Sequence, residues 1–346
     1  MNNKKIIIGL SGGVDSTAAV ILLKKQGYDV TGCFIDVTGH DVNGMESAKK
    51  AAEQLEIPLI LRNVEKDFSQ KIIDNFCREY SCGRTPNPCI ICNPMIKFKV
   101  LAEEADKLGI RYISTGHYAS VEHDEKTDTW YIAKATSNKD QSYMLYRLDQ
   151  SVIKRLVFPL GCMSSKDEIR NIAREAGIFN SEKKDSMEIC FLDDNTDFTK
   201  FIEERGFDSK LGNFVYKDGK IIGKHKGIAD YTIGQRKGLG IAIGKPAFIT
   251  SIDPDSGNIV IGDNQDLFRK EIFAEDCVFA GEKPDENGLE VQAKIRYAAK
   301  PEDAKVYPGE NGQYRIVFVN PVRAATPGQS VVFYSGNRVS GGGFIV

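Results

Sequence analysis

The pattern of hydrophobic and polar residues changes once along the chain, at about Gly206. Before this point, short runs of β-branched and other apolar residues alternate with longer amphipathic segments. The apolar runs are residues 4–10, 28–37, 57–64 and 110–116, and the amphipathic segments are residues 17–27 and 45–56. Strands that alternate with helices predict an α/β domain with a parallel sheet and right-handed crossovers. Ligands of such sheets bind at the carboxyl ends of the strands.

Beyond Gly206 the helical periodicity disappears, and short β-type runs are separated by glycine and other turn residues. Such runs predict hairpins and the strands of a β-barrel. A further boundary is expected between Gly262 and Lys270. We therefore predict three parts: an α/β catalytic domain over residues 1–205, a central basic β-rich domain over 206–266 and a C-terminal β-barrel over 267–346.

The composition is that of a globular chain, since 41% of the 346 residues are hydrophobic and 27% are charged. No apolar run approaches the ~18 residues of a membrane span, and the N-terminal run is too short for a signal peptide. We therefore expect a cytoplasmic protein with no membrane partner. Eight cysteines are far from the density of a disulfide scaffold. In a reducing compartment they are expected to be buried, catalytic or metal-binding.

The net charge of −2 conceals a basic segment. Residues 205–246 contain nine Lys and Arg residues and three Asp residues, which gives a local charge of +6. Such a segment suits a polyanion, since contacts from Lys and Arg to phosphates supply most of the non-specific affinity for nucleic acid. A solvated basic face is the alternative explanation of the same charge.

The segment GLSGGVDST, residues 9–17, follows the first predicted strand and opens the first predicted helix. Gly12 and Gly13 permit a tight turn with N–H groups that point into the loop, and a helix N-terminus favours an anion. Further hydroxyl donors come from Ser11, Ser16 and Thr17. Asp15 offers the hard oxygen ligands that suit Mg²⁺. The loop lacks the Gly-Lys-Ser/Thr of a Walker A motif and resembles the pyrophosphate loop of the ATP pyrophosphatase superfamily.

Members of that superfamily cleave ATP between the α and β phosphates and adenylate a substrate oxygen, so the resemblance implies ATP as a cofactor. Adenylation turns the oxygen into a good leaving group, and a nucleophile must then displace it. Cys89, Cys92 and Cys190 are the candidates, because a thiolate is the strongest side-chain nucleophile and is favoured by nearby positive charge. Lys97 and either Lys183 or Lys184 are close to these thiols in sequence.

Eight motifs, spread in order over nearly the whole chain, resemble those of the bacterial tRNA 2-thiouridylases. They are SGGVDS, GRTPNPxxxCN, TGHY, NKDQSYMLYRL, FPLG, KKDSMEICF, YTIGQRKGLG and the terminal PGQSVVFY…GGG. That family adenylates the C2 oxygen of the wobble uridine of certain tRNAs and replaces it with sulfur delivered as a cysteine persulfide. The resemblance implies a tRNA-uridine 2-sulfurtransferase. Its partners would be tRNA and a sulfur donor, either a cysteine desulfurase or an intermediate carrier.

The resemblance also implies roles for individual residues. Cys190 would hold the persulfide, and Cys92 would be the thiol that resolves the disulfide or frees the sulfide. The residues that would bind ATP are Gly9, Leu10, Ser11, Gly12, Gly13, Val14, Asp15, Ser16, Ile35 and Gly116. The residues that would border the target base or contact tRNA are Asn87, Pro88, Cys89, His117, Lys139, Asp140, Gln141, Arg236, Lys237, Arg296, Tyr297 and Gln329. Residues 139–141 are also predicted to begin a helix, with Asn138 as its cap.

One position departs from the family, in which most members have aspartate where this chain has Cys89. That carboxylate is a proposed acid/base group, and the change leaves three interpretations open. Cys89 and Cys92 would form a redox dithiol in a sulfur relay. Alternatively, Cys89, Cys92 and Cys190 would ligate an iron–sulfur cluster with one iron open to sulfide, as in related RNA thiolation enzymes. The third interpretation is a structural zinc site made by Cys77, Cys82, Cys89 and Cys92.

Two alternative functions follow from these interpretations. One is the same adenylation and thiolation of a different RNA nucleotide with an iron–sulfur cluster. The other, from a different class, is an RNA-binding protein with a structural zinc site, which leaves the ATP loop without a use. The remaining cysteines, Cys33, Cys162 and Cys277, lie among apolar residues and are predicted to belong to the core.

Overall fold

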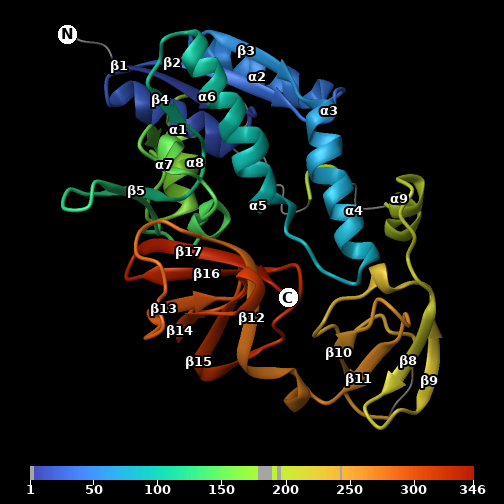
Figure 1. Ribbon diagram of the computed structural model, residues 1–346. Coiled ribbons are helices and arrows are strands. Elements are labelled where there is room, and N and C mark those ends of the chain that lie inside the picture. The colour runs from blue at the N-terminus through green and yellow to red at the C-terminus, as the bar shows by residue number, and fades with distance from the viewer. Residues whose placement is uncertain (1–3, 178–188, 193–195, 242–243) are drawn as a thin grey trace. The chain divides into compact units, whose positions relative to one another are not determined.

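The computed structural model describes residues 4–177, 189–192, 196–241 and 244–346 (Figure 1). The chain divides into two compact units. The first comprises Met1–Ile72, Cys89–Phe191 and Gly336–Ser340, and the second comprises Ile73–Pro88, Leu192–Ser335 and Gly341–Val346. Each unit therefore contains segments that are far apart in the sequence. Within the described part of the chain, no helix has the length and apolar character needed to cross a membrane.

Five strands form the sheet of the first unit in the order β3-β2-β1-β4-β7. Their bounds, in that order, are Leu59–Asn63, Tyr28–Asp36, Lys4–Gly9, Tyr112–Ser114 and Leu156–Val157. All neighbouring strands pair in parallel. Ile6, Ile7 and Ile8 of the central strand β1 are fully buried, as expected of a parallel strand covered on both faces. The predicted α/β domain with a parallel sheet is confirmed.

The connections between consecutive strands contain the helices α1 (Val14–Lys25), α2 (Val42–Gln54) and α6 (Phe98–Lys107). α1 shares one core cluster with α8 (Lys166–Glu175), because apolar residues of both helices are buried together. The shorter helical segments in this part of the chain are α3 (Glu65–Phe68), the π-helical turn η1 (Ser69–Ile73), α5 (Pro88–Cys92), the π-helical turn η2 (Asn93–Lys97), the 3-10 helix η3 (Ser142–Leu145) and α7 (Gln150–Ile153). The antiparallel hairpin of β5 (Ser120–Asp124) and β6 (Thr129–Ala133) completes the unit.

The second unit contains a four-stranded sheet and a closed barrel. The sheet has the order β10-β11-β8-β9, with bounds Phe248–Ile252, Ile259–Gly262, Gly212–Tyr216 and Ile221–His225. The barrel strands are β12 (Phe268–Phe279), β13 (Leu289–Lys294), β14 (Glu302–Pro308), β15 (Tyr314–Arg323), β16 (Ser330–Ser335) and β17 (Arg338–Ile345). Pairing of β12 with β17 closes the barrel, so these described strands have no open edge. The predicted C-terminal barrel is confirmed.

Among the described residues, the α-helices that lie wholly in the second unit are α4 (Asp74–Ser81) and α9 (Phe198–Glu204). Phe76 and Tyr80 of α4 contact Phe198 of α9 edge to face, with ring centroids 5.6 and 4.6 Å apart. Among the described residues beyond Gly206, helical structure is confined to the short 3-10 turns η4 (Ile228–Asp230), η5 (Asn264–Leu267) and η6 (Glu310–Gly312). The change of pattern near Gly206 therefore marks the change from helices to strands.

The segment from Gly83 to Pro88 leads from α4 to the cysteine pair. It contacts several other elements of the second unit. Arg84 forms ion pairs with Glu79 of α4 and Glu275 of β12, both at 2.8 Å. The Thr85 carbonyl accepts a hydrogen bond from the Gln329 side chain at 2.8 Å. A side chain on Gly83, which has φ +67°, would come within 2.6 Å of Ile252. We call Gly83–Pro88 the anchored segment. Its stiffness comes from these contacts as well as from its two prolines.

His225 at the end of β9 is a buried polar residue in the four-stranded sheet. Its Nε2 donates a hydrogen bond to the Gly257 carbonyl at 2.7 Å. The rings of Phe214 and Tyr231 lie against it, with centroids 5.3 and 5.6 Å from the imidazole. Removal from water lowers the pKa of His225 below its usual 6.5, although nearby carbonyls oppose the shift. The folded protein therefore holds this imidazole neutral.

A pH-dependent loss of stability follows from this lowered pKa. Below pH 6.5 the unfolded chain binds a proton at His225 that the folded chain resists, so the free energy of unfolding falls as the pH falls. His225→Phe should flatten this dependence between pH 6.5 and 5, and lower stability at pH 7.5 by about 1–3 kcal/mol because the Gly257 carbonyl loses its donor. Urea titrations at several pH values measure both effects. An unchanged slope in the variant would contradict the account.

Candidate active site

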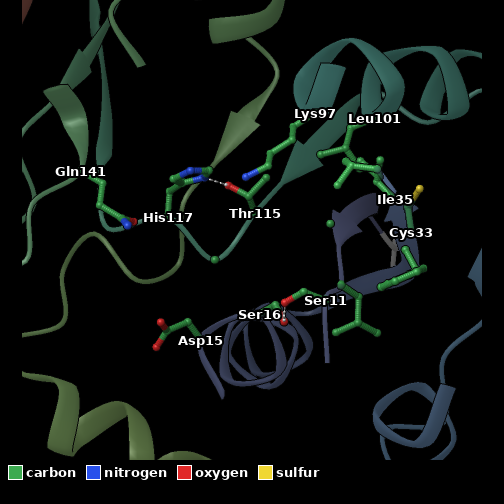
Figure 2. Close-up of a pocket in the computed structure, with 15 residues that line it drawn as sticks. Ser11, Asp15, Ser16, Cys33, Ile35, Lys97, Leu101, Thr115, His117 and Gln141 are labelled. Atoms are coloured by element: carbon green, nitrogen blue, oxygen red, sulfur yellow. Dashed lines mark hydrogen bonds between the residues drawn. The ribbon is translucent and has the colours of Figure 1, made fainter. Parts of the chain in front are cut away.

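A cavity of about 390 Å³ lies in the first unit (Figure 2). Most of its lining residues lie at or just after the carboxyl ends of β1, β2 and β4, which is where a ligand of a parallel sheet is expected. The lining residues are Gly9, Leu10, Ser11, Asp15, Ser16, Cys33, Phe34, Ile35, Val37, Lys97, Leu101, Thr115, Gly116, His117 and Gln141. In the view of Figure 2, Ser11 and Ser16 lie on one side of the cavity, and Lys97, Thr115 and His117 lie on the other.

The predicted ATP residues divide into two groups. Those that line the cavity are Gly9, Leu10, Ser11, Asp15, Ser16, Ile35 and Gly116. Those that do not line it are Gly12, Gly13 and Val14, which form the turn and the start of α1. The hydroxyl oxygens of Ser11 and Ser16 are 3.3 Å apart, so the two donors face the same space. Thr17 does not line the cavity, and its fully buried hydroxyl donates to the Gly13 carbonyl at 2.8 Å. The prediction of Thr17 as a donor in the loop is wrong.

Two glycines keep the start of α1 accessible. Gly12 has φ +71°, and a Cβ there would lie 2.5 Å from the backbone of Ser47 in α2. A Cβ on Gly116 would lie 2.9 Å from the backbone nitrogen of Ser16. Any side chain at either position would displace backbone, so both close approaches require glycine. The N–H groups at the start of a helix attract an anion. The loop is therefore shaped for a phosphate group.

Asp15 is the second residue of α1, and both of its carboxylate oxygens have partners. Oδ1 accepts a hydrogen bond from the Tyr118 hydroxyl at 2.8 Å. Oδ2 is 3.1 Å from the Lys166 ammonium of α8, whose side chain is 8% exposed. Neither partner was among the predicted site residues. Both carboxylate oxygens of Asp15 therefore have a partner within the first unit.

His117 lies on the opposite side of the cavity, next to Lys97. Its Nδ1 is 2.7 Å from the Thr115 hydroxyl, and its ring stacks on Phe98 with centroids 5.8 Å apart. Burial, with a smaller contribution from the Lys97 charge, lowers the pKa of His117 to about 3. The imidazole is therefore neutral at physiological pH. It can exchange hydrogen bonds with a base or sugar, but it brings no charge to a phosphate.

Lys97, the last residue of η2, lines the cavity and is also close to three of the cysteines. Its ammonium lies within electrostatic range of Cys89, Cys92 and Cys190. Burial lowers the pKa of Lys97, but the interaction with the three cysteines raises it, and the net shift is upward. Burial raises the pKa of Cys92 to about 12 against the opposing effect of Lys97. Desolvation likewise raises the pKa of Cys190, whose side chain is nevertheless exposed. Lys183 and Lys184 lie outside the described residues.

All eight cysteines lie within the described ranges, and none of them is part of a disulfide in this structure. Over the described residues, no group of three or more His, Cys, Asp or Glu side chains is arranged to hold a metal ion. Cys77 is buried in α4 and Cys82 is exposed. Cys33 is buried and Cys277 is half-buried. Cys162 is exposed, in the turn after β7, with its thiol 3.8 Å from the Pro159 carbonyl. Its assignment to the core is wrong, because apolar neighbours in sequence do not fix the direction of a turn residue.

The residues predicted to contact tRNA lie in both units. His117 and Gln141 line the cavity, and the Gln141 side chain accepts a hydrogen bond from the Tyr118 backbone at 3.0 Å. Lys139 and Asp140 precede Gln141 in a turn. The predicted helix start at Lys139 is wrong, because η3 begins at Ser142 and Asp140 accepts the Ser142 N–H at 3.2 Å. The N-cap of η3 is Gln141, so Asn138 does not have the capping role that was predicted for it.

In the second unit, Arg236 and Lys237 are exposed. Tyr297 is 37% exposed, and the Lys294 ammonium lies 5.4 Å from its ring centroid. Arg296 donates to the Arg323 carbonyl at 2.6 Å, and Gln329 donates to the anchored segment. These two side chains therefore also hold their own unit together. Asn87 and Pro88 end the anchored segment and are half-buried, as is Cys89.

Several lining residues were not predicted from the sequence. They are Cys33, Phe34, Val37, Leu101 and Thr115. Phe34 and Val37 flank Ile35 at the end of β2, and Thr115 precedes Gly116. These three residues could have been found from the sequence, because each lies within two positions of a predicted ligand residue at a strand end. Leu101 lies on α6 with no neighbouring motif, and only the packing of that helix brings it to the cavity.

The geometry defines a class of protein, an α/β domain with a pyrophosphate-type loop and a thiol group beside its cavity. Residues 4–194 match the family described as the tRNA methyl transferase HUP domain. Residues 199–263 match the tRNA methyl transferase PRC-barrel domain, and residues 269–345 match the aminomethyltransferase β-barrel domain.

Relatives match over the full length. A tRNA-specific 2-thiouridylase MnmA 2 from Clostridium botulinum strain Hall is 46% identical over 100% of this chain and 99% of that protein. A tRNA-specific 2-thiouridylase MnmA from Acetivibrio thermocellus is 43% identical over 100% of both chains. The corresponding MnmA from Clostridioides difficile strain 630 is 45% identical over 99% of this chain and 98% of that protein. The chain belongs to the tRNA-specific 2-thiouridylase family.

The close approach at Gly12 generates a prediction with a matched control in the same loop. Gly12→Ala should abolish ATP binding, because the new methyl group meets the Ser47 backbone and φ is positive. Gly13→Ala should reduce affinity for ATP less than about threefold, because its Cβ meets only the Ser11 hydroxyl at 3.3 Å and φ is −79°. Calorimetric titration with ATP measures both. Equal losses in the two variants would show that the steric account is wrong.

Proposed function

We propose that this chain is an ATP-dependent tRNA-uridine 2-sulfurtransferase that replaces the C2 oxygen of the wobble uridine with sulfur. The observation that carries the proposal is the position of Lys97, which lines the phosphate-loop cavity and also lies in the electrostatic range of Cys89, Cys92 and Cys190. An adenylation site and a sulfur nucleophile are thus adjacent in one unit. Membership of the 2-thiouridylase family supports the same reaction.

The first step of the proposed reaction is adenylation. The uridine C2 oxygen attacks the α-phosphorus of ATP, the bond from the α-phosphorus to the bridging oxygen of the β-phosphate breaks, and pyrophosphate leaves. The N–H groups at the start of α1 and the hydroxyls of Ser11 and Ser16 would hold the phosphates. Ile35 and Gly116 would border the adenine. His117 and Gln141, on the far side of the cavity, would orient the uridine with neutral hydrogen bonds.

The second step is sulfur transfer. The terminal sulfur of a persulfide on Cys190 attacks C2, and the C2 oxygen leaves with AMP. A thiolate of Cys92 then attacks the Cys190 sulfur, which releases the thiolated uridine and leaves a Cys92–Cys190 disulfide for reduction by an external thiol. Because the pKa of Cys92 is raised to about 12, Cys92 must lose its proton during the reaction. The Lys97 charge lowers the cost of that loss.

Cys89 stands where most members of the family have aspartate, three positions before Cys92. A sulfur relay and an iron–sulfur cluster would give Cys89 different roles in the reaction. In the relay, Cys89 exchanges with Cys92 as a dithiol. In the cluster mechanism, three thiolates hold iron, and this donor set has the right chemistry. The described thiols are not arranged as a metal group, however, so no step is derived through a cluster. The relay needs no metal, and it is the mechanism that we propose.

The basic segment of the second unit is the proposed RNA-binding surface. Part of its charge is already neutralised, because Lys217 is paired with Asp263 and Asp266, and Lys245 is paired with Asp263. Arg236 and Lys237 are exposed in the loop before β10 and would contact tRNA phosphates. Arg296, Tyr297 and Gln329 of the barrel would contact the anticodon arm. A sulfur-donor protein would supply the persulfide.

Cys190→Ser tests the assignment of the persulfide. The variant should lose sulfur transfer by about 1,000-fold or more, because a hydroxyl cannot carry a persulfide, while release of pyrophosphate in the presence of tRNA continues. Mass spectrometry of the tRNA and a pyrophosphate assay measure the two steps. Cys162→Ser is the matched control, since that thiol is also exposed. Sulfur transfer that survives in Cys190→Ser would exclude the persulfide role.

Iron, zinc and labile-sulfide analysis of protein purified without oxygen distinguishes the roles of Cys89. The relay predicts metal-free wild-type protein with reactive thiols, and Cys89→Asp should retain thiolation within about tenfold because it restores the usual family residue. Iron and sulfide that are present in wild type and lost in Cys89→Ser would instead establish the cluster mechanism. Zinc bound by wild type and lost in Cys77→Ser would support the structural zinc site.

Arg236 and Lys237 generate a prediction on salt dependence. Replacement of both by alanine should weaken tRNA binding and reduce the slope of log K against log salt by about 1 to 2, according to how many phosphates the two side chains neutralise. Replacement of Lys49 and Lys50 of α2 removes the same charge elsewhere and should leave the slope unchanged. An unaltered slope in the Arg236/Lys237 variant would remove this loop from the RNA-binding surface.

A further inference from the structure

A π-helical turn interrupts the helix that carries the cysteine motif. Helices α5 and α6 extend from Pro88 to Lys107 with only the turn η2 between them. In this turn the Phe98 N–H donates to the Asn93 carbonyl, five positions back, whereas an α-helix bonds residues four apart. Pro94 lies within the turn. It has no N–H to donate and its ring crowds the carbonyl four residues back, so a regular helix cannot pass through it.

The π-helical turn decides which residue faces Cys92. Successive residues of an α-helix are about 100° apart, so the fifth residue after Cys92 would lie about 140° around the axis. A π-helical turn instead closes between residues five apart and brings them to the same side. Lys97 is that fifth residue, and its backbone N–H forms a hydrogen bond with the Cys92 sulfur. In Figure 2 the Lys97 side chain extends from its helix toward Thr115 and His117.

Asn93, the first residue of η2, holds this turn against η3. The residue is 1% exposed, and its Nδ2 donates to the Met144 carbonyl of η3 at 3.0 Å. η3 is itself fixed, because the Met144 N–H donates to the Gln141 carbonyl at 3.0 Å and Leu145 is fully buried. Gln141 lines the cavity. Asn93 therefore joins the turn that ends in Lys97 to the segment that carries Gln141.

Stability alone does not explain an asparagine at this position. Within the part of the chain that the structure describes, the Asn93 Oδ1 is buried and has no hydrogen-bond partner. A buried acceptor without a donor costs as much free energy as one hydrogen bond contributes, or more. An apolar side chain of the same size would avoid that cost. What Asn93 provides is the direction of its one hydrogen bond, which fixes the turn.

The other ionisable groups around Lys97 do not replace its charge. Cys89 and Cys190 also lie within its electrostatic range, and both are thiols. His117 is neutral, since burial lowers its pKa to about 3. Among these described groups, Lys97 is the one that brings a positive charge to Cys92. The position of this one side chain therefore matters for the chemistry of the thiol.

We propose that Asn93 is a positioning residue that holds the π-helical turn in place, so that Lys97 faces Cys92 when Cys92 attacks the adduct between Cys190 and the tRNA. The inference rests on the sulfur transfer of the proposed function. In that step a bond forms between the Cys92 and Cys190 sulfurs, and the bond from Cys190 to the sulfur on C2 breaks. The electron pair leaves with the thiolated uridine. The Cys92 proton ends on N3 of that ring, which lost its own proton on adenylation.

The Lys97 ammonium stabilises the negative charge that Cys92 carries before the new sulfur–sulfur bond forms. A turn that relaxed toward an α-helix would rotate Lys97 away from the thiol. The attack by Cys92 would then be slow, while adenylation at the other side of the cavity would continue. The adduct between Cys190 and the tRNA would accumulate as a result.

Accumulation of this adduct is the test. Full-length protein is loaded with persulfide by a cysteine desulfurase and mixed with ATP and tRNA. A denaturing gel without reductant then follows the tRNA that migrates with the protein. Asn93→Ala should slow release of the tRNA about tenfold or more and change pyrophosphate release less than about twofold. Cys92→Ser should trap the adduct. A residue that only stabilised the fold would lower both steps together, and that result would overturn the proposal.

Asn93→Leu keeps the test decisive if Asn93→Ala does not fold. Leucine fills the same space, so no cavity forms, and it removes the acceptor that has no partner. It should slow release as much as alanine does. Gln150→Ala is the matched control. The Gln150 amide also donates to a backbone carbonyl, that of Trp130 at 2.7 Å, and neither residue lines the cavity. This variant should change neither step.

A double-mutant cycle tests whether Asn93 acts through Lys97. Release should be slow in Lys97→Met, and addition of Asn93→Leu should slow it no further. Release at the wild-type rate in Asn93→Leu, or additive losses in the double variant, would overturn the inference. A wild-type protein that forms no thiolated tRNA would instead contradict the proposed function.

Discussion

The close packing of backbone around the start of α1 is the constraint on which the site depends. Gly12 approaches α2 and Gly116 approaches Ser16 at distances that leave no room for a Cβ. This packing leaves the N–H groups of the helix start open to the cavity while the apolar face of α1 is buried against α8. The same helix that completes the core therefore also provides the anion site. A change in the packing of α1 would affect the fold and the chemistry together.

Most ionisable groups around this helix start are neutral or paired. Asp15 is neutralised by Lys166, His117 is neutral because burial lowers its pKa, and Cys92 is a neutral thiol because burial raises its pKa. Lys97 is the cation that lies between the cavity and the thiols. If the proposed reaction takes place here, the charges of ATP and of the persulfide would be the largest changes in the local electrostatics.

Local patterns in the sequence were sufficient for the elements that form within one segment. The strand–loop–helix of residues 4–25 was predicted because an apolar run, glycines and helical periodicity follow one another. Ile35 and Gly116 were named because of the resemblance to the 2-thiouridylases, and both line the cavity. The contact of Lys166 with Asp15 joins residues 151 positions apart, and no local pattern encodes it. The predictions for Thr17, Asn138 and Cys162 were wrong for local reasons. The Thr17 hydroxyl bonds to a nearby carbonyl, the helix after Asn138 begins later than predicted, and Cys162 lies in a turn that directs it to the surface.

The anchored segment has a consequence for how this family can change. Arg84 and Thr85 are tied to β12 and to Gln329, and the chain continues directly from Pro88 to Cys89. The cysteine motif therefore starts from a point whose position the barrel helps to set. A barrel taken from a distant relative would have to keep partners equivalent to Glu275 and Gln329, because these barrel residues hold the anchored segment. The barrel is closed on itself and contains its own core, but an exchange of the barrel alone would leave Arg84 and Thr85 without these partners.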